Sequence, residues 1–314
     1  METRLDSWLC KCGLAAWKAL RAFVSLCLCL GVLRTVCVFP AFAGCGVAPE
    51  RDDDFYWEND KVGFRAYGPR DVHRWSGIDV FNKGHAADEV VKLLRGKGAC
   101  GAWHNLATLK GGVRTFDNYT MGASRGVGGV AFWGDGEWKT YPNWISSEVL
   151  RHDGDRLQFK LVYPAFSAAG KMTCLITLKR GDRFFRNDVS FEKSFFGDFA
   201  AGPGLDLEPT RGHKGSLVEE PGFVSLFEDE KFDAKGNPEG STMAAILVAD
   251  PSAVEVRTDC QNCRVLAFRK RTFTYWAGAS WSGAGEITTP EAWHAHVRAF
   301  REKIQDKKQN GDRK

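Results

Sequence analysis

Hydrophobic and polar residues alternate along most of the chain in short segments, and glycine- and aspartate-containing turns separate them. Such alternation, with many β-branched and aromatic residues, predicts antiparallel β-hairpins. The predicted hairpins are Val130 to Trp133 with Trp138 to Tyr141, Trp144 to His152 with Arg156 to Pro164, and Met172 to Lys179 with Phe184 to Phe191.

The same pattern predicts further strands on both sides of these hairpins: Tyr56 to Tyr67 (strand, turn, strand), Gly77 to Phe81, Gly222 to Phe227, Thr242 to Val248, Ala253 to Arg257, Val265 to Arg269 and Phe273 to Ala277. Helical spacing is confined to His85 to Arg95 and to Thr289 to Lys303, where Thr289 suits the N-cap and Pro290 the first helical position. Hairpins that follow one another without intervening helices predict an all-β fold, a large antiparallel β-sandwich with a C-terminal helix.

The N-terminal 43 residues have the features of a secretory signal. Basic residues precede the apolar run Ala22 to Leu33, and the small residues of Ala41-Phe42-Ala43 follow it. Phe42 to Cys45 also resembles a bacterial lipoprotein box. We therefore expect an exported protein, which is periplasmic, secreted or an outer-membrane lipoprotein, with membrane contact only through a lipid anchor at Cys45.

After that segment we expect a polar lead-in over residues 44–54, one β-sandwich domain over 55–306 and a basic tail over 307–314. The formal net charge is +4 with both signs interspersed, which gives no argument for a nucleic-acid partner. Five of the ten cysteines lie in the first 43 residues. Cys260 and Cys263 lack the further ligands of a zinc site, so we predict a local disulfide, no metal and no cofactor.

Two glycine-rich stretches, Ala99 to Trp133 and Gly197 to Glu220, interrupt the hairpin pattern. Glycine at this density is costly unless the backbone must bend sharply or approach a ligand closely. Both stretches carry cationic and proton-transferring side chains, and we predict that they line one pocket. These residues are His104, Asp117, Tyr119 and Arg125 in the first stretch, and Arg211 and His213 in the second.

The predicted roles follow from the chemistry of these side chains. His104, Tyr119, Asp117 and His213 are candidate catalytic acids and bases. Arg125, Arg211 and Arg65 are candidates for binding a carboxylate, and Trp103 and Trp281 for stacking on sugar rings.

Each assignment has a structural alternative. Asp117 could hold a turn, Arg125 could form a buried salt bridge with Asp117, and Trp276 and Trp281 could pack in the core. Glu58 and Asp60 fit a surface turn, although Glu58 is also a possible carboxylate for hydrolysis. His294 and His296 lie on the C-terminal helix and are not expected to be catalytic.

Five segments in register resemble the bacterial family of domain of unknown function 4861: WENDKVGFRAYGP, SGIDVF, FDNYTMGASRGVGG, GFVSLFEDE with STMAAILVADP, and YWAGASWSGAGE before TPEAWHAHVRAF. The resemblance implies a galactose-mutarotase-like β-sandwich and a carbohydrate substrate. This chain has Trp103-His104 where the family has tyrosine-histidine. It has Leu109-Lys110-Gly111 where the family tends to carry an acid.

These observations predict a carbohydrate-active protein whose partner is an oligo- or polysaccharide. The favoured activity is that of a lyase or hydrolase on acidic, uronate-containing glycans. In β-elimination an arginine neutralises the uronate carboxylate while histidine or tyrosine removes the adjacent proton. A mutarotase-type sugar epimerase and a non-catalytic glycan-binding sandwich are the alternatives.

Overall fold

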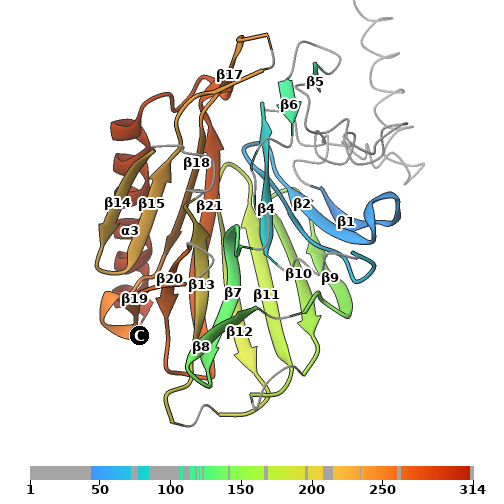
Figure 1. Ribbon diagram of the computed structural model, residues 1–314, viewed down its shortest axis with the longest axis vertical. Coiled ribbons are helices and arrows are strands. Elements are labelled where there is room, and N and C mark those ends of the chain that lie inside the picture. Colours follow the sequence, from blue (N-terminus) through green and yellow to red (C-terminus); the bar gives the residue numbers. More distant parts are fainter. Residues whose placement is uncertain are drawn as a thin grey trace, which may run out of the picture. The chain divides into compact units, whose positions relative to one another are not determined.

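The computed structural model describes residues 44–71, 77–84, 107–108, 114–116, 119, 121, 124–140, 142–165, 169–194, 197–207, 215–233, 235–259 and 263–311. All of them belong to one compact unit, Ala41–Lys314. Within these residues the strands form a six-stranded, an eight-stranded, a five-stranded and a two-stranded sheet, and Figure 1 shows how they are arranged.

An antiparallel eight-stranded sheet forms one layer, in the order β14-β15-β18-β21-β12-β11-β10-β9. Its strands are β9 (Ser146–His152), β10 (Arg156–Tyr163), β11 (Met172–Lys179), β12 (Phe184–Phe191), β14 (Ser216–Glu220), β15 (Phe223–Phe227), β18 (Thr242–Leu247) and β21 (Thr272–Trp281). The predicted hairpin β11–β12 has the predicted bounds, because the turn at Arg180-Gly181-Asp182 fixes the register of two strongly alternating strands.

Two smaller sheets form the second layer, in the orders β1-β2-β3-β4-β6-β5 and β19-β20-β13-β7-β8. The six strands of the first are β1 (Gly44–Ala48), β2 (Asp54–Glu58), β3 (Gly63–Ala66), β4 (Ile78–Lys83), β5 (Ala107–Thr108) and β6 (Arg114–Phe116). The five strands of the second are β7 (Val127–Gly134), β8 (Glu137–Thr140), β13 (Ala200–Asp206), β19 (Glu255–Thr258) and β20 (Cys263–Ala267). A parallel bridge between Ile78 and Gly126 links them.

The main core lies between the two layers. Trp57 of β2 packs against Phe159 of β10 and Phe185 of β12, with ring centroids 5.3 and 5.6 Å apart. On the five-stranded side, Tyr275 of β21 donates a hydrogen bond to the backbone oxygen of Gly128 in β7. The expected antiparallel β-sandwich is confirmed.

The C-terminal helix α3 (Pro290–Gly311) packs on the other face of the eight-stranded sheet, over β15 and β18. Its apolar face joins a second core, in which Trp293 and Phe300 stack on Phe184. The predicted N-cap is confirmed, because the Thr289 hydroxyl accepts the Ala292 N–H at 3.3 Å. The helix continues beyond the predicted end at Lys303.

The second glycine-rich stretch contains strands that the sequence pattern did not predict. β13 lies centrally in its sheet, and its small residues carry no alternation signal. They are small because neighbours approach closely: a Cβ on Gly202 would lie 1.8 Å from the Leu266 backbone oxygen. β14 follows at the edge of the larger sheet.

The polar lead-in also differs from expectation, because β1 lies within it and pairs with β2. Cys45 faces Trp57 in this pairing, and its side chain packs against the main core. Burial raises the pKa of the Cys45 thiol to about 12. This geometry gives no support to a lipid anchor at Cys45.

The remaining elements are short: β16 (Lys231–Phe232), β17 (Pro238–Gly240), η1 (Pro49–Arg51), η4 (Pro251–Ala253) and η5 (Ser282–Ala284). The predicted helix at His85 to Arg95 lies outside the described residues. Among the described helices, none has the length and apolar composition needed to cross a membrane.

Gly202→Ala tests the close packing of β13. The added methyl group collides with a backbone atom and forces β13 and β20 apart, so we expect a loss of about 1–3 kcal/mol and a lower Tm. Gly154→Ala is the matched control, because a Cβ there meets nothing within 4 Å. Equal thermal melts of the two variants would contradict the packing argument.

Candidate functional site

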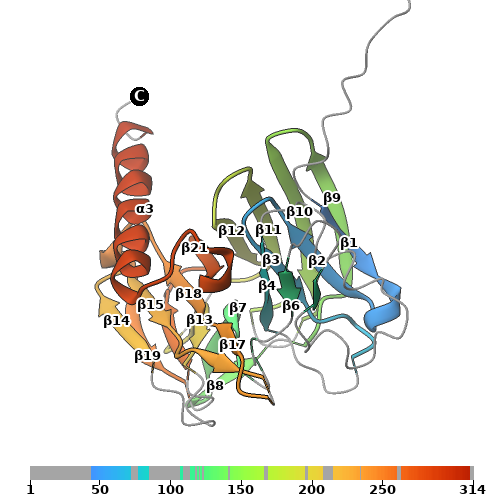
Figure 2. The ribbon, with the colours of Figure 1, turned by 90° about the horizontal axis from the view of Figure 1, so that it is seen from above.

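The candidate site is a groove of about 630 Å³ on the outer face of the eight-stranded sheet, on the part of that face beside α3 that the helix leaves uncovered. We call it the outer groove. Side chains of β10, β11, β12 and β21 line it on one side and side chains of α3 on the other. Figure 2 shows α3 rising beside β21 and β18, with β10–β12 on the far side.

Strand alternation places these side chains. Along β10 and β11 every second residue is buried in the main core, and the residues between them face outward. The outward positions include polar residues on all four strands of the groove. The alternation of apolar and polar residues that forms the core therefore also determines which residues line the groove.

Four outward residues form one row across the sheet: Gln158, Thr177, Arg186 and Trp276 face each other in register on β10, β11, β12 and β21. We call this the transverse row. The Gln158 amide donates to the Thr177 hydroxyl at 3.0 Å. The Arg186 guanidinium lies 5.9 Å from the centre of the Trp276 indole and donates to Asp188.

Positive charge accumulates next to the transverse row. Arg156 on β10 and Lys179 on β11 are directly opposite each other, and α3 adds Lys307 to the same groove. We call these three residues the cation cluster. Among the described residues none of the three has an ion-pair partner. Burial lowers the pKa of Lys179, the charges of Lys307 and Arg156 lower it further, and the charge of Asp182 opposes them.

The acidic residues of the outer groove are already engaged. Asp188 accepts hydrogen bonds from Arg186 and Thr274, and Asp250 accepts from Lys308 and caps the short helix η4. Asp182 lies 3.9 Å from Lys303. An indole face beside uncompensated cations suits a ligand that combines flat apolar surfaces with negative charge.

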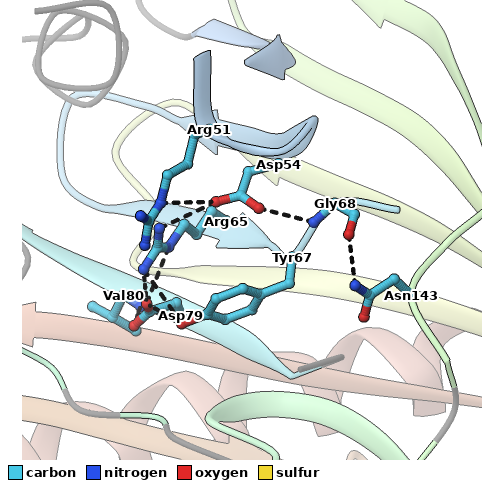
Figure 3. Close-up of polar contacts among 8 residues, drawn as sticks. All are labelled: Arg51, Asp54, Arg65, Tyr67, Gly68, Asp79, Val80 and Asn143. Atoms are coloured by element: carbon cyan, nitrogen blue, oxygen red, sulfur yellow. Dashed lines mark hydrogen bonds and ion pairs between the residues drawn. The ribbon is translucent and has the colours of Figure 1, made fainter. Parts of the chain in front are cut away.

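Arg65, predicted to bind substrate, instead lies inside the second layer. It is 1% exposed and forms ion pairs with Asp54 at 3.1 Å and Asp79 at 2.6 Å. Tyr67 donates to the same Asp79 carboxylate, and the Gly68 N–H donates to Asp54 (Figure 3). In the described structure Arg65 ties β2, β3 and β4 together.

Arg125 is also buried, at 1% exposed, and pairs with Asp259 at 2.8 Å. Its backbone N–H contacts the Cys263 sulfur at 3.5 Å, and Gly204 leaves room for its side chain. Arg125 thus forms a buried salt bridge, but with Asp259; Asp117, the expected partner, lies outside the described residues. The predicted pairing of Cys260 with Cys263 is not described, because Cys260 lies outside the described residues.

Tyr119 lies in the same interior region at 3% exposed. Burial raises the pKa of its hydroxyl well above the usual value, and the charges of Asp206 and Glu228 add to this. The Asp206 N–H donates to the Gly126 oxygen at 2.9 Å. The two glycine-rich stretches thus meet at their described ends, where Tyr119 and Arg125 are buried. The single pocket stays a prediction, because its other four residues lie outside the described residues.

Five of the predicted site residues lie outside the described residues: Trp103, His104, Asp117, Arg211 and His213. Their predicted roles stay predictions. Trp281 is 2% exposed and donates to the Glu239 oxygen, so its ring faces the interior. Its neighbour Trp276 is the aromatic residue of the outer groove.

The other residues weighed from the sequence have structural surroundings. Glu58 is buried and accepts from Lys83 at 2.7 Å, whereas the Asp60 carboxylate accepts the Gly181 N–H. His294 lies between the hydroxyls of Ser216 and Ser225.

Sequence reasoning missed the outer groove although it predicted the strands that form it. The available signal was the set of residues that the strand alternation directs away from the core. This set includes Arg156, Lys179 and Arg186, which lie near one hairpin turn. What joins this set to Trp276 is the pairing of β12 with β21, which are far apart in the sequence.

The described residues thus form a large antiparallel β-sandwich with a C-terminal helix, and the outer groove lies on one face of its larger sheet. Residues 39–309 match the family described as "Domain of unknown function (DUF4861)", and the chain belongs to this family. The resemblance seen in the sequence is confirmed.

Uncharacterized protein P7 of Formosa agariphila is 26% identical over 270 residues, which are 82% of this chain and 66% of that protein. The chain thus spans just under two thirds of the length of this relative.

Two solved structures show a weaker likeness. The GH36 α-galactosidase AgaB from Geobacillus stearothermophilus matches with a TM-score of 0.39 and 9% identity, covering 76% of this chain and 41% of that one. A doubly substituted AgaA from the same organism, in complex with stachyose, matches with a TM-score of 0.35 and 8% identity, over 72% and 40%. Likeness at this level says nothing about activity.

Arg125→Ala tests the interior position of this residue. The substitution removes the cation facing the buried Asp259 carboxylate, and we expect a loss of about 3 kcal/mol or more in denaturant unfolding. Adding Asp259→Asn should restore part of that loss. Wild-type stability of the single variant would mean that Arg125 has no structural role.

Asp54 should make stability depend on pH. Burial, only partly offset by Arg65, raises its pKa from 3.8 to about 6. The folded chain therefore binds more protons than the unfolded chain between these values, and the free energy of unfolding falls as the pH rises from about 4 to about 6. The total change is at most about 3 kcal/mol. Asp54→Asn should remove this part of the pH profile, and an unchanged slope would refute the assignment.

Proposed function

We propose that this chain is a carbohydrate-active protein that binds an acidic oligo- or polysaccharide in the outer groove. One observation carries the proposal: the half-buried indole of Trp276 and a cation cluster without an ion-pair partner among the described residues line the same groove. Sugar rings stack on aromatic side chains through their C–H faces, and carboxylate or sulfate groups bind Arg and Lys through charge-assisted hydrogen bonds. The predicted secretory signal supports placing this function outside the cytoplasm.

The chemical step within this proposal is elimination or hydrolysis of a uronate-containing glycan. The residues that support it are the acids and bases predicted from the glycine-rich stretches, such as His104, Asp117 and His213. Among the described residues that line the outer groove there is no histidine or tyrosine. The groove accordingly supports binding, and a non-catalytic glycan-binding sandwich is the second candidate. A mutarotase-type epimerase is the third, and it rests on the family resemblance alone.

Trp276→Ala and Arg186→Ala test the binding surface. We expect each variant to bind a polyuronate about tenfold more weakly than the wild type, as measured by calorimetry at low ionic strength. Trp133→Ala is the matched control, because Trp133 is a half-buried indole on β7, in the other layer. Unchanged affinity in both groove variants would refute the proposed surface.

Two competitors decide the ligand class in the same experiment. A neutral polysaccharide should bind more weakly than the polyuronate, and single-stranded DNA of similar charge should not compete with it. Competition by DNA would mean that the groove binds polyanions in general rather than acidic saccharides. Incubation with the polyuronate then separates the activities: absorbance of an unsaturated product marks elimination, and new reducing ends without it mark hydrolysis.

A further inference from the structure

The outer groove contains two chemically different regions, and their separation is set by the sheet. Trp276 lies on β21, whereas Lys179 lies two strands away on β11 and two residues further along than Thr177 of the transverse row. With a strand spacing of about 4.8 Å and a rise of about 3.4 Å per residue, the two are roughly 10 Å apart across the sheet and 7 Å along it.

The cation cluster has no ion-pair partner among the described residues, and the nearby Asp182 charge offsets only part of the repulsion at Lys179. Like charges directly opposite on neighbouring strands destabilise a sheet, and Arg156 and Lys179 are such a pair. Lys307 brings a third positive charge from α3 into the same groove. Nearby Asp182 is 3.9 Å from Lys303, an alternative cation that lies outside the cluster. An anionic ligand would relieve the repulsion and gain hydrogen bonds from several donors.

The Trp276 region has different chemistry. Arg186 lies over the indole at 5.9 Å and is held there by Asp188, which also accepts from Thr274. The guanidinium charge is thus largely compensated by the protein. Trp276 packs partly against the second core and is half-buried, and the accessible part of its indole lines the groove. Such a surface selects ring shape and hydroxyl groups more than net charge.

We infer that the outer groove has two subsites: Trp276 stacks one sugar ring, and the cation cluster of Arg156, Lys179 and Lys307 binds an oxyanion carried by another sugar of the same chain. The separation exceeds one monosaccharide ring, so the smallest ligand that engages both subsites is an acidic disaccharide or longer. The shared chemistry is an oxyanion, either a uronate carboxylate or a sulfate ester. This inference rests on the proposed glycan-binding function and specifies which part of the groove binds the anionic group of the ligand.

The test compares three oligosaccharides of equal length in calorimetric titrations: an oligouronate, its carboxyl-reduced neutral form, and a neutral backbone carrying sulfate esters. The wild type should prefer one or both of the charged ligands over the neutral one by roughly ten- to hundredfold, as expected for the loss of charge-assisted hydrogen bonds. The preferred charged ligand identifies the oxyanion. Equal affinity for charged and neutral ligands would overturn the inference.

The variants assign that preference to the cation cluster. Arg156→Met with Lys179→Met should abolish the preference and leave affinity for the neutral ligand unchanged, whereas Trp276→Ala should weaken all ligands by a similar factor. Lys171→Met is the matched control: this exposed lysine directly precedes the same strand at its opposite end, and the variant should keep the preference. Circular dichroism and thermal melts confirm that each variant is folded.

The outcomes separate this inference from the function on which it rests. If the wild type prefers charged ligands and the double variant still does, the cation cluster is not the anion subsite although the proposed function stands. A loss of preference in Lys171→Met would indicate a diffuse charge effect and overturn the inference. If no saccharide binds the wild type, the proposed function itself is wrong.

Discussion

The two-residue period of the eight-stranded sheet is the constraint on which both the core and the outer groove depend. In β10, β11 and β12 each inward residue packs against the second layer, and each outward residue is thereby fixed on the opposite face. A shift of one residue in any pairing would exchange the two sets. The strong preference for burying side chains such as Phe159 and Phe185 therefore also holds Arg186 in register with Trp276.

The position of α3 decides which part of that outward face stays accessible. The helix covers β15 and β18 with an apolar surface that includes Trp293 and Val297, and the last buried residue of this surface is Ile304. Around Ile304 the helix also carries Lys303, Lys307 and Lys308, which line the groove. The helix thus closes the second core and supplies one wall of the groove.

Much of the fold could be predicted from the sequence because its hairpins are local. Turn residues and alternation indicated β7 to β12 and most later strands. β13 escaped prediction because Gly202 and Gly204 are required by neighbouring atoms, a cause that lies elsewhere in the chain. The outer groove could not be predicted for the same reason. The glycine-rich stretches are recognisable from local composition, whereas the groove depends on the pairing of strands that are far apart in the sequence. Local composition marks Tyr119 and Arg125 as candidate site residues, but the spacing of residues along the chain does not show that they are buried.

Interior and groove cations differ in a way that supports ligand binding over a merely basic surface. Arg65, Lys83 and Arg125 are buried, and each faces a carboxylate, because an uncompensated charge in the interior is very costly. Arg156 and Lys179 face each other instead. Burial and the charges of Lys307 and Arg156 lower the pKa of Lys179, and the charge of Asp182 opposes them. In the interior each of these cations thus has a carboxylate partner, which stability requires. Arg156 and Lys179 have no ion-pair partner among the described residues, so an anionic ligand could bind to them.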